Sequence, residues 1–233
     1  MKRLEIIGLT GLPEFKEGDD IVEEILKCLS TQSIELTNKS VLVIAQKIVS
    51  KVEGQMRKIL NEEDFNSLVS SESQKIIRKR GKTIIAQTKH GFICANVGID
   101  RSNIEKGFAL LLPENPDESA KKIRRHIERE LDIEVGIIIS DTFGRAWRNG
   151  QINVAIGISG IEPLKSYVGE KDSFDNELNI TQIAIADELS SAAELVMGKT
   201  ENIPIAIISN YEFTRSEKRI EEMIRKESED YFL

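Results

Sequence analysis

The sequence predicts an α+β fold of mixed sheets with packed helices, in one unit over residues 1–233 that either stays whole or divides into two structural subdomains. Short apolar runs bounded by turn residues are typical of buried strands, and longer segments with helical spacing are typical of amphipathic helices. Both occur, but without the steady alternation that a doubly wound parallel sheet requires. With 233 residues, 40% of them hydrophobic, the chain has enough apolar side chains for a large core.

In the N-terminal half, apolar runs predict strands and two segments predict helices. Asp19 precedes apolar residues at helical spacing from Ile21 to Leu29, so we expect it to cap the first helix. Residues 62–80 are charged with scattered apolar positions, which favours a surface helix. The predicted strands are Leu4–Leu9, Val41–Val49, Ile84–Gln87 and Phe92–Ile99, with a turn at His90-Gly91 between the last two.

In the C-terminal half, Asp117 is expected to cap a charged helix that runs to about Leu131. The clearest helical pattern is Thr181 to Lys199, where apolar residues share one face and Gly198 ends the helix. Ser216 is expected to cap a terminal helix rich in Glu and Lys. The predicted strands are Val135–Ile139, Ile152–Ile158 and Ile203–Ser209.

The composition excludes several classes of protein. The net charge of -7 argues against a surface that binds double-stranded nucleic acid, although a local basic pocket is compatible with it. Two distant cysteines and two histidines are too few for a disulfide framework, a zinc cluster or a histidine-rich metal site. No apolar run approaches the roughly 18 residues of a membrane span, and the N-terminus lacks a signal-peptide pattern. We therefore expect a cytoplasmic protein with no membrane and no nucleic acid as partner.

The segment between the two central strands carries the most chemistry. It contains Asp141-Thr142, then Arg145 and Arg148, in a predicted loop. Loops held by rigid strands often carry functional groups. A carboxylate beside a hydroxyl suits a hard divalent cation, and arginines suit phosphate or carboxylate groups. The segment is therefore either a metal–phosphate site or an Asp-Thr turn with two solvated arginines.

Polar residues also follow two other predicted strands. Asp100, with Asn103 just after it, ends one strand, and Gln46-Lys47 leads another towards Lys51. If these ends converge with Asp141, two carboxylates would hold metal ions and the cationic side chains would surround the anionic groups that the ions bridge. Phosphoryl transfer needs this combination of charge neutralisation and positioning. The alternative for each aspartate is an Asx-turn that closes its strand.

Three weaker candidates remain open. The turn at Gly11-Leu12-Pro13 either presents backbone N–H groups to a nucleotide or is a plain turn. Glu212 follows the last strand and is a candidate further metal ligand. Gly198-Lys199-Thr200 looks like the end of a phosphate-binding P-loop, but Ala193 stands where that motif needs glycine, so we reject the motif.

Several ordered segments together resemble the coenzyme F420-0:L-glutamate ligase (CofE) family. The resemblance spans nearly the whole chain and is weakest over about the last 25 residues. Several motifs in the same order are far more specific than any single one. The segments are Gly11–Glu14 (GLPE), Lys16–Asp20 (KEGDD), Lys47–Gly54 (KIVSKVEG), Cys94–Asn103 (CANVGIDRSN), Asp141–Gly160 (DTFGRAWRNGQINVAIGISG) and Ala186–Lys199 (ADELSSAAELVMGK).

The resemblance implies a reaction that the composition does not reveal. In that family the γ-phosphate of GTP passes to a carboxylate of F420-0, L-glutamate attacks the acyl phosphate, and a second round adds a γ-linked glutamate. It also implies Mg2+ or Mn2+ at two sites, a potassium ion, and an intertwined homodimer of the family's unusual α+β fold. The alternatives are a related ligase with a different carboxylate acceptor and a non-catalytic nucleotide-binding protein.

The resemblance also implies roles for individual residues. Asp100 and Asp141 match metal-binding aspartates, and Thr142 matches a neighbouring metal ligand. Apart from the resemblance, the residues themselves suggest that Arg145 and Arg148 offset charge on the phosphate or the acceptor carboxylate. The implied GTP contacts are the loop Leu12, Pro13, Glu14 and Phe15, the strand-end residues Gln46, Lys47 and Lys51, and Asn103.

Overall fold

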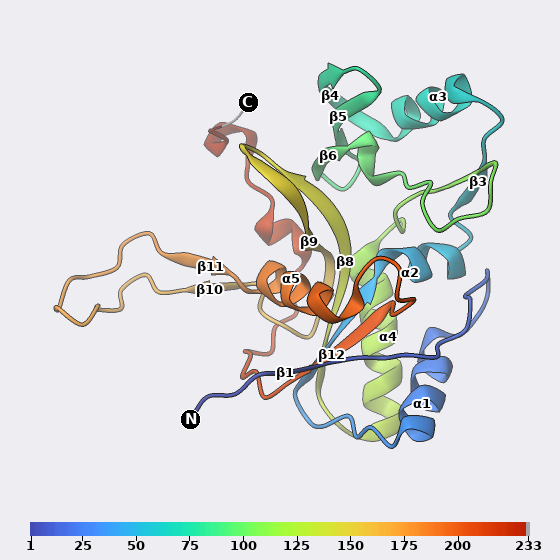
Figure 1. The fold of residues 1–233 in the computed structure, drawn as a ribbon. Coiled ribbons are helices and arrows are strands. Elements are labelled where there is room, and N and C mark those ends of the chain that lie inside the picture. The colour runs from blue at the N-terminus through green and yellow to red at the C-terminus, as the bar shows by residue number, and fades with distance from the viewer. Residues whose placement is uncertain (232–233) are drawn as a thin grey trace.

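The computed structural model describes residues 1–231 and shows a mixed α and β structure with several sheets (Figure 1). The main sheet of this described part has five strands in the order β1-β12-β2-β8-β9. Only β2 and β8 run parallel, and the other neighbours are antiparallel. The strands are β1 (Glu5–Gly8), β12 (Ile205–Ser209), β2 (Ser40–Ala45), β8 (Val135–Arg145) and β9 (Arg148–Ser159).

Helices cover both faces of the main sheet. Helix α4 (Pro116–Leu131) packs on one face, with α1 (Ile21–Gln32) beside it, and α5 (Ile185–Met197) packs on the other (Figure 1). Strands buried on both faces appear in sequence as continuous apolar runs. This explains why Val41–Ile44 and Ile137–Ile139 are fully buried and why the apolar runs located them correctly.

A second, smaller apolar cluster lies outside the main sheet and its helices. Its buried side chains are Phe65, Val69, Ile84, Ala86, Val97, Ile99, Ala109 and Leu111. Helix α2 (Gln46–Val52) contacts β2 and β8 on one side and β7 on the other, so it joins the two parts. The smaller part contains β3 (Met56–Lys58), α3 (Glu62–Glu72), β4 (Ser73–Arg80), β5 (Thr83–Thr88), β6 (Ile93–Ala95), the 3-10 helix η1 (Asn96–Gly98) and β7 (Phe108–Leu110).

A two-stranded arm projects from the main body (Figure 1). Its strands, β10 (Leu164–Ser166) and β11 (Gln182–Ala184), pair antiparallel near the base. Beyond them, Val168, Phe174 and Ile180 are exposed on the arm. Among the described residues, every helix is too short or too polar to cross a lipid bilayer.

Two helix caps differ from the prediction by one or two residues. Asp20, not Asp19, accepts hydrogen bonds from the backbone N–H groups of Val22 and Glu23 and so caps α1. Asn115, not Asp117, caps α4, which places Pro116 in the first turn. Asp117 instead accepts hydrogen bonds from the distant backbone N–H groups of Ile158 and Ile220. Sequence alone does not reveal these long-range partners.

Two predicted elements change type part-way along. The predicted strand Val41–Val49 ends at Ala45, and α2 follows it with Gln46, Ile48, Val49 and Ser50 buried. The predicted helix over residues 62–80 ends at Glu72. The remainder forms β4, because pairing with β5 supplies its backbone hydrogen bonds and overrides a weak helical pattern.

The predicted central loop is part of one long hairpin. Strands β8 and β9 continue to Arg145 and Arg148, with the turn at Ala146-Trp147, so Asp141 and Thr142 lie within a strand. The apolar runs end earlier because the hairpin extends beyond the core, where its polar residues face the cleft or solvent.

The predictions for the last two helices of the sequence were partly correct. Helix α5 ends at Met197 and Gly198 caps it as predicted, but it begins at Ile185 because residues 182–184 form β11. The predicted terminal helix from Ser216 is wrong over its described residues, which contain the 3-10 helices η2 (Ile220–Met223) and η3 (Glu227–Glu229). The backbone N–H of Ile220 is bound by Asp117, which fixes the chain in a non-helical path. Residues 232 and 233 lie outside the described residues.

Candidate active site

A polar cleft of about 670 Å³ lies where α2, the segment after η1, the β8–β9 hairpin and the end of α5 meet. It joins segments that lie far apart in the sequence, and the loop 12–15 also lines it. The carboxylates of Asp100 and Asp141 both line it, as the strand-end argument expects. The other predicted site residues that line it are Leu12, Pro13, Glu14, Phe15, Gln46, Lys47, Lys51, Asn103 and Thr142.

Three predicted site residues are not among the described residues that line the cleft. Arg145 and Arg148 lie at the tip of the hairpin, where the Arg145 guanidinium donates to the backbone carbonyl of Asn149. Glu212 follows the carboxyl end of β12, and β12 runs antiparallel to β2. That pairing puts Glu212 beyond the edge of the sheet opposite to the cleft. Within this chain, these three residues therefore lie apart from the part of the cleft that Asp141 lines, and their proposed roles stay predictions.

A left-handed turn positions Asp100. Asn96, Val97 and Gly98 all have positive φ angles, of 50°, 50° and 72°. This conformation is strained for a β-branched residue such as Val97, which is held by burial in the smaller cluster. Backbone hydrogen bonds in both directions then tie Asp100 to Leu110. The turn and the bridge fix the carboxylate at the edge of the cleft.

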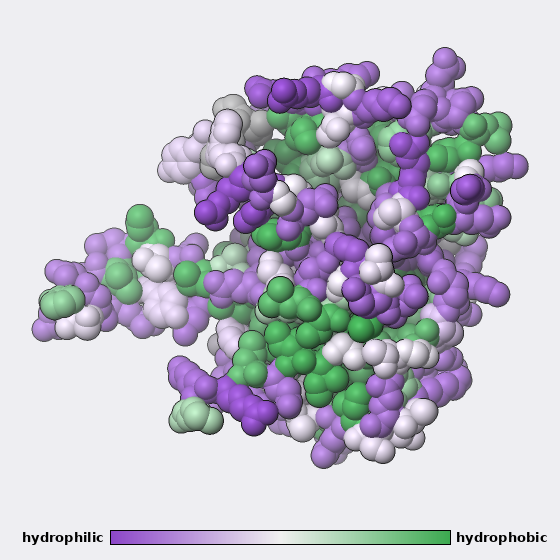
Figure 2. All heavy atoms as spheres, viewed as in Figure 1, coloured by the Kyte–Doolittle hydropathy of each residue, from purple (hydrophilic) through white to green (hydrophobic). Residues whose placement is uncertain are grey.

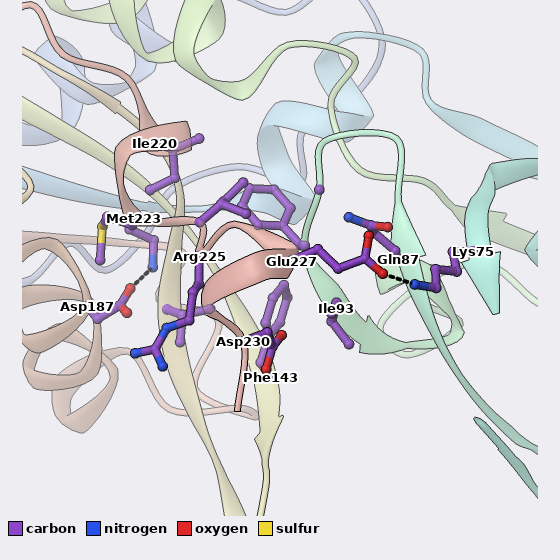
Figure 3. A pocket seen from close by; sticks show the side chains of 15 residues that line it. Lys75, Gln87, Ile93, Phe143, Asp187, Ile220, Met223, Arg225, Glu227 and Asp230 are labelled. Atoms are coloured by element: carbon purple, nitrogen blue, oxygen red, sulfur yellow. Dashed lines mark hydrogen bonds and ion pairs between the residues drawn. The ribbon is translucent and has the colours of Figure 1, made fainter. Parts of the chain in front are cut away.

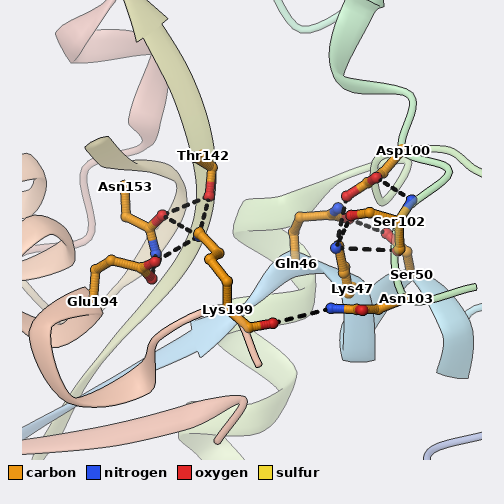
Figure 4. A network of polar contacts seen from close by, with 10 residues as sticks. All are labelled: Gln46, Lys47, Ser50, Asp100, Ser102, Asn103, Thr142, Asn153, Glu194 and Lys199. Atoms are coloured by element: carbon orange, nitrogen blue, oxygen red, sulfur yellow. Dashed lines mark hydrogen bonds and ion pairs between the residues drawn. The ribbon is translucent and has the colours of Figure 1, made fainter. Parts of the chain in front are cut away.

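The Asp100 carboxylate pairs with a lysine from α2. Its Oδ2 lies 2.7 Å from Lys47 Nζ, and its Oδ1 accepts from the backbone N–H of Ser102 at 2.6 Å (Figure 4). Burial acts to raise the pKa of Asp100, but the Lys47 ammonium and the Ser102 amide outweigh it and hold that pKa below its usual range. Asp100 is therefore ionised at neutral pH.

Asp141 lies in a less favourable electrostatic environment. Burial raises its pKa to about 7, and the Asp100 carboxylate adds to that shift, while the Thr142 backbone amide, Lys47 and Lys199 oppose it. The effect of Asp100 on the pKa of Asp141 is consistent with both carboxylates lining one cleft. We call Lys47, Asp100 and Asp141 the aspartate cluster.

The start of α2 adds donors to the same wall. Gln46 is 1% exposed, and its Oε1 accepts from the Ser50 hydroxyl at 2.8 Å. Its Nε2 has no hydrogen-bond partner among the described residues, although buried donors are normally paired. Lys51, one turn after Lys47, forms an ion pair with Glu14 of the predicted nucleotide loop. An anionic ligand in the cleft would therefore meet one unused donor and two ammonium groups.

The opposite wall carries a second polar network, which we call the lysine cluster: Thr142, Asn153, Glu194 and Lys199 (Figure 4). The Thr142 hydroxyl donates to Asn153 Oδ1 at 2.7 Å, and Asn153 Nδ2 donates to Glu194 Oε2 at 2.7 Å. Lys199 Nζ lies 2.6 Å from Glu194 Oε1 and 2.7 Å from Thr142 Oγ1. Sequence reasoning missed Asn153, Glu194 and Lys199. It dismissed Lys199 together with the failed P-loop motif, although a lysine directly after a helix-ending glycine was a usable signal.

The aspartate cluster fits a divalent cation. Its carboxylates are the hard oxygen donors that Mg2+ and Mn2+ prefer, and a cation would offset the cost of burying charge on Asp141. Within the described residues, no group of three or more acidic, His or Cys side chains is placed to hold a metal alone. Further ligands would therefore come from phosphate oxygens and water, as is usual for Mg2+.

A second, smaller cavity of about 280 Å³ lies beside β9, under η2 and η3 (Figure 3). Its walls include Phe143 and Met223, and Lys75 pairs with Glu227 across it. Asp187 accepts from the backbone N–H of Ala155 there, and burial raises the pKa of its carboxyl. None of the predicted site residues is among the described residues that line it, whereas eleven of them line the larger cleft.

A cleft that pairs two interacting carboxylates with several lysines is typical of enzymes that bind phosphorylated ligands together with a divalent cation. Comparison with known proteins identifies the family. Residues 10–210 match the family described as F420-0:Gamma-glutamyl ligase. The chain therefore belongs to this family and is a ligase.

Named relatives cover almost the same length. The chain is 40% identical to the coenzyme F420:L-glutamate ligase of Methanocaldococcus jannaschii, over 99% of this chain and 97% of that protein. It is 38% identical to the enzymes of the same name from Methanothermobacter thermautotrophicus, over 98% of both chains, and Methanococcus maripaludis, over 99% of this chain and 97% of that protein.

Proposed function

We propose that this chain is a GTP-dependent ligase that joins L-glutamate to coenzyme F420-0 and then adds a γ-linked glutamate to the product. The main support is that one cleft gathers the residues expected to bind metal and nucleotide, in a chain 38–40% identical to relatives named as this ligase over nearly their whole length. That near-complete coverage favours the same substrates over a different acceptor.

The nucleotide phosphates would lie along α2 and the Leu12–Phe15 loop. Lys47 and Lys51 would exchange their carboxylate partners, Asp100 and Glu14, for phosphate oxygens. The unused Nε2 of Gln46 would donate to the same group. Release of Asp100 from Lys47 would leave both aspartates free to hold Mg2+ or Mn2+, which supplies charge neutralisation on the transferred phosphoryl group.

The proposed reaction has two steps. A carboxylate oxygen of F420-0 attacks the γ-phosphorus, the bond to the β-phosphate oxygen breaks, and GDP leaves. The amine of L-glutamate then attacks the acyl carbon, phosphate leaves, and the nitrogen loses a proton as the amide forms. The protein contributes mainly position and electrostatics, because little covalent chemistry falls to its side chains. The potassium ion stays a prediction.

We also propose the expected homodimer, with the arm as part of the interface. Val168, Phe174 and Ile180 are 53–89% exposed on the arm, and Figure 2 shows apolar side chains on it and a patch nearby over α5 and β1. Exposed apolar groups gathered in this way mark contact surfaces. In such a dimer, the arm of each subunit would contact the other subunit.

The dimer is tested by light scattering. The wild type is expected at twice the chain mass of 26.2 kDa, and Phe174→Asp with Ile180→Asp is expected to shift it to the monomer. Leu60→Asp, at an exposed apolar residue of the smaller part, is the matched control and should stay dimeric. A monomeric wild type would refute the dimer.

The proposed function is tested by mass spectrometry of a reaction containing F420-0, GTP, L-glutamate and Mn2+. We expect products heavier by one and then two glutamate residues, formed only with GTP and metal. Ligation of glutamate to another carboxylate, with F420-0 untouched, would support the different-acceptor alternative. GTP binding without glutamate-dependent phosphate release would support the non-catalytic alternative.

A further inference from the structure

The second cavity lies next to the polar cleft along two strands that both spaces share. On β6, Ile93 lines the second cavity and Ala95 lines the cleft. On β8, Phe143 lines the second cavity, and Asp141 and Thr142 line the cleft. Two residues of a strand span only roughly 7 Å. The two spaces are therefore close enough for one extended ligand to occupy both.

Aromatic and aliphatic side chains form much of the wall of the second cavity. Phe92 and Phe143 meet edge to face there, with ring centroids 6.1 Å apart. Met223 and Ile224 line it from the C-terminal segment. Its volume of about 280 Å³ is near the lower end of the range for small-molecule sites, roughly 300–1,000 Å³, and such sites are mostly apolar. Aromatic walls of this kind suit a planar ring, which can stack on them or meet their edges.

The C-terminal segment above this cavity is held at several points. Asp117 accepts a hydrogen bond from the backbone N–H of Ile220, and Glu227 pairs with Lys75 of β4. Between these contacts, the C-terminal segment packs on the turn before β6, where a Cβ added to Gly91 would lie 3.2 Å from a side-chain carbon of the segment. The cavity is therefore already formed in the chain without a ligand, as is usual for small-molecule sites.

The charges around the second cavity are mixed in sign, unlike the lysines of the cleft (Figure 3). Lys75 is paired with Glu227, and Asp187 accepts from the backbone N–H of Ala155, so its carboxyl ties α5 to β9. Gln87 lines the cavity with an amide that can both donate and accept hydrogen bonds. The cavity therefore suits an uncharged planar group with polar edges better than it suits an anion.

We propose that the second cavity holds the planar deazaflavin ring of the acceptor F420-0, while the acceptor carboxylate lies in the cleft beside Asp141. The ring would contact Phe92, Phe143 and Met223, and the amide of Gln87 would bind its polar edge. Burial of the ring would position the carboxylate for attack on the γ-phosphorus, because binding of a non-reacting part orients the reacting part. This inference rests on the proposed function, since it names where the acceptor of that reaction lies.

The test follows the four methionine methyl groups by NMR in protein made with methionine that carries 13C in its methyl group. Met223 lines the second cavity and Met197 lines the cleft, whereas Met56 is not among the described residues that line either. Replacement of each methionine by leucine assigns the signals. We expect a β,γ-imido GTP analogue with Mg2+ to shift the Met197 signal and to leave Met223 in place. Saturating F420-0 added to that complex should then shift Met223, because an aromatic ring changes the chemical shift of a methyl group beside it, and should leave Met56 unmoved.

A cavity-filling variant tests the same site by steady-state kinetics. Ile93→Trp puts a larger ring into the cavity at a side chain that is 39% exposed, and we expect it to raise KM for F420-0 about tenfold with KM for GTP within about twofold. Ile76→Trp is the matched control. This isoleucine lies on β4 of the same small sheet, is 55% exposed and is not among the described residues that line the cavity, so both KM values should stay near wild type.

An unmoved Met223 signal at saturating F420-0, or an unchanged KM for F420-0 in Ile93→Trp, would overturn the inference and leave the proposed function standing. The NMR measurement uses the wild type, so it decides the question even if Ile93→Trp folds poorly. A wild type that neither binds F420-0 nor adds glutamate to it would count against the proposed function itself.

Discussion

The two walls of the cleft solve the same electrostatic problem in opposite ways. The aspartate cluster buries carboxylates with too little positive charge, and the pKa of Asp141 rises to about 7 as a result. The lysine cluster pairs the Glu194 carboxylate with the ammonium of Lys199, and hydrogen bonds connect all members of the cluster. The comparison teaches that the two walls differ in charge balance: carboxylates are in excess in the first, whereas the second pairs its carboxylate with the ammonium of Lys199.

Asp141→Asn should have the largest effect, because it removes charge from the wall that depends on a bound cation. We expect glutamate ligation to fall at least about a thousandfold, since the amide cannot neutralise a divalent ion. Product formation by mass spectrometry measures it, and circular dichroism checks the fold. Asp187→Asn, at a buried carboxyl of the second cavity, is the matched control and should stay within about twofold. Activity retained in Asp141→Asn would discredit the metal assignment.

Lys47→Ala should come next, because Lys47 serves both the nucleotide and Asp100. We expect kcat/KM for GTP to fall about a hundredfold, through loss of a charge-assisted phosphate contact and an unpaired Asp100. Steady-state kinetics measures this. Lys89→Ala, which breaks the exposed ion pair with Glu72, should leave the value near wild type. An equal loss in both variants would show a general charge effect instead.

Glu194→Gln should have a smaller effect, since Lys199 keeps its contact with Thr142 when Glu194 loses its charge. We expect about a tenfold fall in kcat/KM for GTP, because the ammonium is less firmly placed. The same kinetic assay measures it. A loss as large as that of Asp141→Asn would mean that Glu194 holds a metal ion, and the contrast between the walls would fail.

The smallest effect concerns the stability of the metal-free protein. Asp141 keeps a proton in the folded state up to about pH 7, whereas its ordinary value is 3.8. The folded state therefore binds more protons between these pH values, so the free energy of unfolding falls as pH rises from 4 to 7. Urea titrations should show a decline in the free energy of unfolding between these pH values that Asp141→Asn lacks. Parallel pH profiles of both proteins would contradict the raised pKa.

Local patterns located much of the core correctly. The apolar runs found β1, β2, β8 and β12, and Gly198 marked the end of α5 as predicted. These features depend on neighbours in sequence, because burial of a strand and the cap of a helix are written in a few consecutive residues. The wrong predictions concern residues with distant partners, such as Asp117, which binds Ile158 and Ile220 instead of capping α4.

The candidate site also divides into features that neighbouring residues predict and features that depend on distant partners. Spacing after strand ends was enough to propose that Asp100 and Asp141 converge, and the family resemblance supplied the nucleotide loop and α2. Spacing could not exclude Arg145 and Arg148, because the sequence does not show that the hairpin continues past the core and carries them away from the cleft.

The sequence by itself determined which segments are buried and that Asp100 and Asp141 follow two of them. It also determined to which family the chain is similar. Only the tertiary structure decided that Lys199, 57 residues further along the sequence, donates a hydrogen bond to the Thr142 hydroxyl. The physical reason is range. Apolar burial and helix caps act between near neighbours, whereas the charge balance of a cleft depends on which distant side chains the packed sheet and helices bring within contact.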